Sequence, residues 1–325
     1  MFVPEYSITT ETLRNISNIE YARSIIENTV ILPHWQKQLE KEAKIRIVKN
    51  SCNDSAETVK AYIDGLERTS RQEIKNMVEA FRLVEDFPIT NELDETDLKK
   101  IHKVVSQNLL PPAKCGVYRS VQSLVKTHPE EILAKITELI DWYNSLDARQ
   151  THPILSAGIL KSQIDNIEPF EKTNLPVANI TTYLVLKMNG YAIKNFFCLE
   201  EYYALNKTGY KKACESFRQN HDDLTAWLEF FTEGFAHELL VLKEKILLLA
   251  RDTKLAKVSG RIDLTTRQER IVEYLQDYGV LTNHTFALLF PNVSEDSILR
   301  DIKTLLSAGV IAKKGKTKSS RYELR

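Results

Sequence analysis

Apolar residues recur at three- and four-residue intervals along most of the first 250 positions of the chain. This spacing places them on one face of an α-helix. The segments that show it are 13–32, 35–48, 58–87, 94–110, 130–146, 154–167, 177–191 and 224–252. Ten glycines and ten prolines in 325 residues leave few breaks between these segments. The pattern therefore predicts a mainly α-helical protein with long helices.

One segment before residue 260 has a β-type pattern. In AKCGVYRSVQSLV, residues 113–125, branched and aromatic residues follow Gly116, so we expect a short β-hairpin there. Helix starts are expected on either side of it. Thr90 and Asp94 are typical N-cap residues, and Pro129 with the acids after it suits a first helical turn.

The pattern changes after Asp252. Residues 251–262 are polar and contain Ser259-Gly260, which indicates a linker. Residues 263–325 then show three short helical patterns and a hairpin pattern, with Gly309 where the third helix should end. Three helices followed by a hairpin are the layout of a winged helix-turn-helix domain.

Composition narrows the class of protein. Hydrophobic residues make up 43% of the chain and charged residues 27%, as in globular proteins. There is no apolar run of about 18 residues and no secretory signal, so we expect a cytoplasmic protein with no membrane partner. The four cysteines, which form no C-x-x-C pair, are expected to be reduced thiols rather than metal ligands. They are Cys52, Cys115, Cys198 and Cys214.

The order of these segments resembles the Fic family over most of the chain. Residues 1–68 are similar to its N-terminal helical region and residues 69–250 to its core. Within the core, CGVYRS resembles the family's target-binding flap, whose pattern is G-x-Y-R, through Gly116, Tyr118 and Arg119. The fold class expected from this resemblance is a Fic-like helical bundle with a short β-hairpin flap, followed by a winged helix-turn-helix domain.

Residues 168–179 fall on the family's active-site signature, H-P-F-x-D-G-N-G-R-x-x-R. In the family the His is the general base for transfer of AMP, or a related group, to a protein hydroxyl. The acid helps to hold Mg²⁺, and the glycines and arginines bind phosphate. This chain keeps Pro169, Phe170 and Asn174. The other functional positions carry Glu168, Lys172, Thr173, Leu175, Pro176 and Asn179.

These replacements predict the loss of nucleotidyl transfer. Threonine and leucine resist the positive φ that the glycines allow, and Pro176 lacks an N–H donor for phosphate. Glu168, with an ordinary pKa of about 4.3, is a weak base for an alcohol. We therefore expect no cofactor. The alternative is an adenylyltransferase that uses ATP with Mg²⁺, with Glu168 as base and Lys172 and Asn174 at the nucleotide.

Other features of the resemblance have simpler alternatives. The family's inhibitory helix carries S/T-x-x-x-E-G/N, and NSCNDSAET, residues 50–58, copies it poorly through Asp54 or Glu57. In the simpler hypothesis, Pro169 ends a helix and Phe170 fills the core, and neither has a further role. The flap can add a strand to a bound peptide, or it can be a plain surface hairpin.

The tail carries the stronger indication of a partner. Residues 261–325 have a net charge of +3, and the preceding 260 residues have −3. We expect a wing that contacts DNA phosphates through five basic residues. They are Lys313, Lys314, Lys316, Lys318 and Arg321. On the third helix, Ser297 and Arg300 are expected to meet base edges, and Lys303 to reach phosphate or guanine.

The function expected from the sequence is a non-catalytic regulator that binds duplex DNA through its tail. In this hypothesis the core is a sensor or a body for homodimerisation. Three alternatives stay open: the adenylyltransferase with an altered site, a protein that binds a peptide or protein partner at the flap, and a winged helix used for protein contacts.

Overall fold

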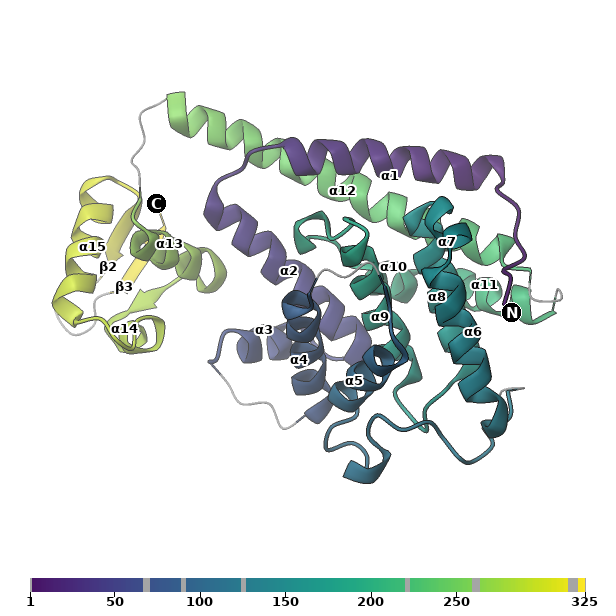
Figure 1. Ribbon diagram of the computed structural model, residues 1–325. Coiled ribbons are helices and arrows are strands. Elements are labelled where there is room, and N and C mark those ends of the chain that lie inside the picture. Colours follow the sequence, from purple (N-terminus) through teal and green to yellow (C-terminus); the bar gives the residue numbers. More distant parts are fainter. Residues whose placement is uncertain are drawn as a thin grey trace. The chain divides into compact units, whose positions relative to one another are not determined.

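The computed structural model describes residues 2–66, 71–88, 92–123, 127–219, 223–258, 264–314 and 321–324. The chain forms two compact units (Figure 1). Unit 1 comprises Met1–Thr29 and Glu40–Lys245, and unit 2 comprises Val30–Leu39 and Ile246–Arg325. None of the helices in these described residues combines the length and apolar character needed to cross a membrane.

The described part of unit 1 consists of helices joined by loops and extended segments. Its helices include α1 (Thr10–Asn28), α3 (Ala56–Ile63), α4 (Gln72–Asp86), α5 (Glu95–Val105), α6 (Ile132–Asn144), α7 (Leu146–Gln150), α8 (Pro153–Ile167), α9 (Asn174–Met188), α10 (Leu199–Leu205) and α11 (Lys207–Gln219). Short 3-10 turns lie at η1 (Pro112–Lys114), η2 (Pro129–Glu131) and η3 (Ile193–Asn195). Two helices, α2 (Pro33–Cys52) and α12 (Thr225–Val258), have residues in both units.

Helices α8 and α9 form the centre of unit 1. They pack against each other, and α4, α5 and α6 pack around them. Most residues of both helices are buried, because they are apolar on nearly every side rather than on one stripe. Lys187 ties the end of α9 to the end of α4 by donating to the carbonyls of Val84 and Glu85 at 2.8 and 2.7 Å. The expected signature, residues 168–179, begins between α8 and α9 and continues into the first turns of α9.

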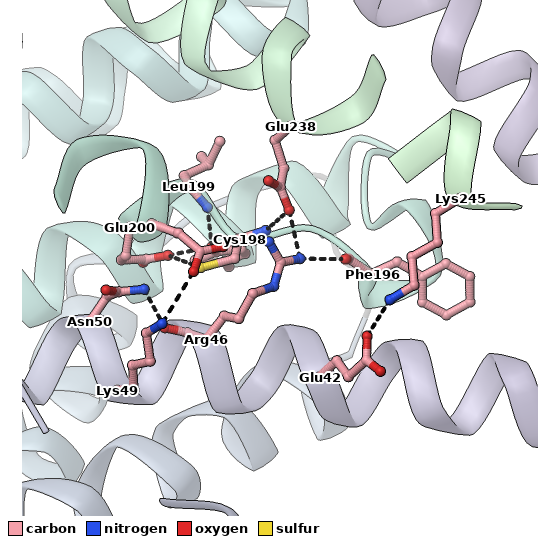
Figure 2. A network of polar contacts seen from close by, with 12 residues as sticks. Glu42, Arg46, Lys49, Asn50, Phe196, Cys198, Leu199, Glu200, Glu238 and Lys245 are labelled. Carbon is pink, nitrogen blue, oxygen red and sulfur yellow. Dashed lines mark hydrogen bonds and ion pairs between the residues drawn. The ribbon is translucent and has the colours of Figure 1, made fainter. Parts of the chain in front are cut away.

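A polar network joins α2 to α10 and α12 (Figure 2). The guanidinium of Arg46 pairs with Glu238 at 2.7 Å and with Glu201 at 2.9 Å. Glu238 also accepts a hydrogen bond from the backbone N–H of Cys198 at 3.0 Å. Because each of these charges has a partner of the opposite sign, we assign the network a structural role.

Unit 2 contains a small three-stranded sheet. Its elements follow as α13 (Thr266–Tyr278), β1 (Leu281–Thr282), α14 (Asn283–Leu289), α15 (Glu295–Ser307), β2 (Ile311–Lys314) and β3 (Arg321–Leu324). The strand order is β1-β3-β2, and β3 pairs antiparallel with both neighbours. One apolar core, which includes Ile271, Phe286, Ile302 and Tyr322, joins the helices to the sheet. The three helices and the C-terminal hairpin expected from the sequence are confirmed.

Two expected segments are described only in part. Helix α12 continues to Val258, so residues 251–258 of the predicted linker are helical. In the flap segment, described residues 113–123 contain η1 and extended chain but no paired strand, and 124–126 lie outside the described residues. Within 113–123 the backbone N–H of Arg119 bonds to the carbonyl of Pro169 at 2.9 Å, and the hairpin expected over 113–125 stays a prediction. The boundary expected between residues 68 and 69 stays a prediction.

Candidate functional site

The loop between α8 and α9 carries two residues with left-handed backbone. Glu168 ends α8 with φ 44°, and Thr173 precedes α9 with φ 61°. A non-glycine residue in this region costs about 1 kcal/mol. The sequence predicted that threonine would resist a positive φ at this position. Thr173 nevertheless adopts it, and its hydroxyl donates to the carbonyl of Lys172 at 2.7 Å.

Asn174 holds the loop closed. Its Oδ1 accepts from the backbone N–H of Phe170 at 2.8 Å, and its Nδ2 donates to the carbonyl of the same residue at 2.8 Å. The Phe170 side chain is 1% exposed and fills the core beneath the loop. Both functional groups of the Asn174 amide are therefore used inside the protein. This arrangement agrees with the simpler hypothesis for Pro169 and Phe170, in which they end a helix and fill the core.

Arg119 of the flap segment is buried at the C-terminal end of α8. It donates from Nε to the carbonyl of Glu168 at 2.8 Å and from Nη2 to the carbonyl of Thr127 at 2.8 Å. Nη1 donates to the carbonyl of Val121 at 3.1 Å. A cation that binds carbonyls at a helix C-terminus satisfies the unpaired acceptors and the helix dipole together. Arg119 therefore attaches the flap to the signature loop.

His102 of α5 contacts both the flap segment and the signature loop. Its ring stacks on Phe170 with centroids 3.8 Å apart, and Nδ1 accepts from the backbone N–H of Gly116 at 2.8 Å. The ring is fully buried, and this burial lowers the pKa of His102 to about 4. Tyr118 packs on the same Phe170 ring, with centroids 5.3 Å apart, and burial raises the pKa of its hydroxyl. The sequence pattern predicts a surface or core role for His102 rather than a ligand role, and the structure places the ring in the core.

The two other predicted residues of the loop, Glu168 and Lys172, are more exposed to solvent. The carboxylate of Glu168 is half-buried and accepts from the hydroxyl of Ser123 at 3.3 Å. Lys172 is exposed. Its neighbour Glu171 pairs with Lys114 at 2.6 Å, which adds a further contact between the loop and the flap segment.

Asn179 lies inside the bundle beside a buried lysine. Lys161 of α8 is 1% exposed and donates from Nζ to Oδ1 of Asn179 at 2.7 Å. The same ammonium lies 5.6 Å from the ring centre of Tyr203 and 5.9 Å from that of Trp227. Burial lowers the pKa of Lys161. An arginine at position 179, as in the family signature, would place a second cation against this one.

The residues of this loop do not fit a Mg²⁺–nucleotide complex. The position of the metal-binding acid carries the cation Lys172, and Asn174 has its amide engaged by Phe170. The two arginine positions carry Pro176, which has no N–H, and Asn179, which binds Lys161. The stretch that corresponds to the inhibitory helix is also used structurally, because Asp54 pairs with Arg71 at 2.7 Å.

Unit 2 presents a second candidate site on α15. Ile298, Ile302 and Leu305 face the core. The opposite face carries the predicted Arg300 and Lys303, both exposed, with the half-buried Ser297 beside them. These three residues line a hollow of about 510 Å³ together with Arg267, Asp301, Thr304 and Ser307. The structure therefore brings together the α15 residues that the sequence predicted, and adds Arg267 from α13.

The predicted wing residues are placed in part. Lys313, Lys314 and Arg321 lie on β2 and β3, and Lys314 pairs in register with Arg321 at the end of the strands that adjoins residues 315–320. Lys314 forms an ion pair with Glu323 at 2.6 Å, so its charge is partly neutralised. Lys316 and Lys318 lie outside the described residues.

Comparison with known proteins bears on the fold. No family model matches the chain. A Fic family protein from Desulfovibrio desulfuricans superposes with a TM-score of 0.65 at 18% identity, covering 100% of this chain and 98% of that one. A fragment of Fic-1 from C. elegans gives a TM-score of 0.60 at 16% identity, covering 75% of this chain and 74% of that one.

A third similar structure is a Fic domain containing signaling protein from Bacteroides thetaiotaomicron. Its TM-score is 0.58 at 17% identity, and the match covers 75% of this chain and 98% of that one. Likeness at such identities concerns the fold and not the activity. The chain has a mainly α-helical, Fic-like fold.

Proposed function

We propose that this protein is a non-catalytic regulator that binds duplex DNA through unit 2. The observation that carries the proposal is the exposed face of α15. The side chains of Arg300 and Lys303 make no hydrogen bond or ion pair within the described part of the chain, so both charges are available to a partner. Exposed, unpaired cations on one helix face are the electrostatic signature of a nucleic-acid contact.

The topology of unit 2 supports the same proposal. The element order α13-β1-α14-α15-β2-β3, with the sheet order β1-β3-β2, agrees with a winged helix-turn-helix domain. In such a domain α15 is the helix that enters the major groove. The basic residues Lys313 and Arg321 are then at the base of the wing, where they contact phosphates.

The signature loop supports the non-catalytic part. A general base, a metal-binding acid and phosphate-binding arginines would each require a free polar group at its position. The acid position instead carries the cation Lys172, and the second arginine position carries Asn179, which binds Lys161. A peptide added as a strand to the flap would require free backbone groups, and the N–H of Arg119 is already bonded to Pro169. We accordingly propose that unit 1 has no catalytic role and regulates DNA binding, as a sensor or as a homodimerisation domain.

The test is a fluorescence-anisotropy titration of random-sequence duplex DNA over a series of salt concentrations. The double variant Arg300→Ala/Lys303→Ala should bind more weakly than the wild type. The slope of log affinity against log salt should fall by about 1.8, because each lost phosphate contact removes about 0.9. If Arg300 or Lys303 contacts a base edge instead of a phosphate, the slope should fall by less than about 1.8. The double variant should then lose more affinity for a DNA sequence that the wild type prefers than for random DNA.

A matched control removes two exposed lysines from unit 1. Lys211→Ala/Lys212→Ala on α11 changes the net charge by the same amount and should leave the slope unchanged. Absence of binding by the wild type at low salt would reject the proposal. It would favour the alternative that unit 2 makes protein contacts.

A further inference from the structure

The hollow on α15 includes one residue of another helix. Arg267 lies in the first turn of α13 and lines the hollow together with residues of α15. The two helices are in contact. Sequence patterns did not single out Arg267, because it lies 33 residues before Arg300 and next to a helix cap.

A buried carboxylate holds Arg267. Its Nε donates to Oδ2 of Asp301, and Oδ1 of Asp301 accepts from Nε2 of Gln268 at 3.3 Å. Asp301 is 7% exposed, whereas the side chain of Arg267 is 38% exposed. Both carboxylate oxygens are thus engaged, and the guanidinium plane is held at the surface in one orientation.

The terminal nitrogens of Arg267 stay free. Only Nε has a hydrogen-bond partner within the described residues, so Nη1 and Nη2 retain their N–H groups. The hydroxyls of the hollow are used differently: that of Thr304 donates to the carbonyl of Arg300 at 3.1 Å, and that of Ser307 to the carbonyl of Thr304 at 2.8 Å. The hydroxyl of Ser297 lies 3.0 Å from that of Ser294. The charged donors of the hollow are Arg267, Arg300 and Lys303.

We infer that Arg267 contacts a backbone phosphate of the bound DNA and that Asp301 is its positioning residue. This inference rests on the DNA binding proposed above. A guanidinium with two free terminal nitrogens matches the oxygens of a phosphate. Arg267, Arg300 and Lys303 outnumber the one acid of the hollow, so the hollow attracts an anion. Because Arg267 is on α13, it contacts the DNA backbone beside α15, the helix proposed to enter the major groove.

The experiment uses the full chain and the same anisotropy series. Arg267→Ala should lower the salt slope by about 0.9. Arg270→Ala removes a cation of the same helix that does not line the hollow, and its effect on the slope should be smaller. Equal slopes for the two variants would overturn the assignment of Arg267.

Asp301→Asn tests the positioning role by the sign of its effect. Removing a negative charge from a DNA-binding face strengthens binding if that charge is a bystander. The control Asp296→Asn, an exposed acid on α15, should do this. Asp301→Asn should instead weaken binding, and should no longer do so when Arg267 is already Ala. Tighter binding by Asp301→Asn in the wild-type background would overturn the inference, while wild-type DNA binding would still support the proposed function.

Circular dichroism and thermal unfolding check that each variant is folded. If Asp301→Asn unfolds unit 2, Arg267→Lys decides the question, because it keeps the charge and leaves Asp301 intact. It should weaken binding with an unchanged salt slope, since lysine cannot present two nitrogens to a phosphate. Binding equal to that of the wild type would overturn the inference. Failure of the wild type to bind DNA at all would remove the proposed function itself.

Discussion

Asn174 and His102 illustrate how single residues near the signature loop are used. The amide of Asn174 binds both backbone groups of Phe170, and the ring of His102 stacks on the side chain of the same residue. His102 also accepts a hydrogen bond from Gly116 through Nδ1, so this nitrogen carries no proton. Phe170 is thus fixed from two sides, and the polar groups around it hold the loop in one conformation.

The buried ring of His102 makes the stability of the protein depend on pH. Its pKa is about 4 in the folded chain, below the ordinary value of 6.5. As pH falls through this window, the unfolded chain binds a proton that the folded chain does not bind. The stabilisation is therefore complete above about pH 6.5, and it is lost towards pH 4 at up to about 1.4 kcal/mol per pH unit.

The variant His102→Asn tests this dependence by urea unfolding between about pH 7 and pH 5. Asparagine keeps an acceptor for Gly116 but does not titrate, so the variant should be less stable than the wild type at pH 7 and should lose less stability on acidification. His237→Asn, at an exposed position on α12, controls for the loss of one histidine. A wild type and variant with parallel pH profiles would show that His102 does not carry the effect.

At the scale of elements, the end of α8 and the flap segment depend on each other. Helix α8 ends in left-handed backbone at Glu168, and the carbonyl of that residue accepts from a side chain 49 positions earlier in the chain, that of Arg119. The flap in turn has no strand pairing in its described part, so this arginine is its main attachment. The two elements should therefore be stabilised or lost together.

Arg119→Met should lower the free energy of unfolding by about 3 kcal/mol, because it leaves buried carbonyls without a donor while keeping most of the side-chain volume. Chemical denaturation measures this loss. The exposed Arg149, which pairs with Glu92 at 3.6 Å, provides the matched control. Arg149→Met should cost less than about 0.5 kcal/mol. A loss for Arg119→Met as small as that of the control would contradict its role as a buried cap.

At the scale of the whole molecule, the fold is Fic-like, and the polar groups of the loop between α8 and α9 are engaged by contacts within the chain. Lys161 shows how the core uses one of the signature positions. The buried ammonium takes the amide oxygen of Asn179 where the family signature has an arginine. An arginine at position 179, as in the family signature, would place a second buried cation beside Lys161, at a cost of several kcal/mol.

The whole protein should show no thermal stabilisation by ATP with Mg²⁺. A ligand present at 100 times its dissociation constant stabilises the folded state by about 2.7 kcal/mol, so a shift in Tm would be easily seen if the site bound nucleotide. ATP without Mg²⁺ and Mg²⁺ alone are the controls. A shift that requires both and grows with ATP concentration would support the adenylyltransferase alternative.

The sequence by itself determined the elements that depend on local pattern. The helical spacing predicted the bundle, and Asp94 caps α5 as expected, whereas Thr90 lies outside the described residues. Gly309 takes the positive φ that follows α15. These features could be predicted because capping, turn geometry and amphipathic spacing involve residues within a few positions of one another. The Fic-like order of segments was also readable, since it rests on the succession of such elements.

Only the tertiary structure decided which polar groups are free. Lys161 and Asn179 are 18 residues apart, and Arg267 and Asp301 are 34 apart. Local pattern marks neither pair. The reason is physical: a buried polar group must find a partner wherever packing provides one, and packing brings together residues that are distant along the chain. For this reason Asn174 and Asn179 are engaged within unit 1, whereas Arg300 and Lys303 are free to meet a partner.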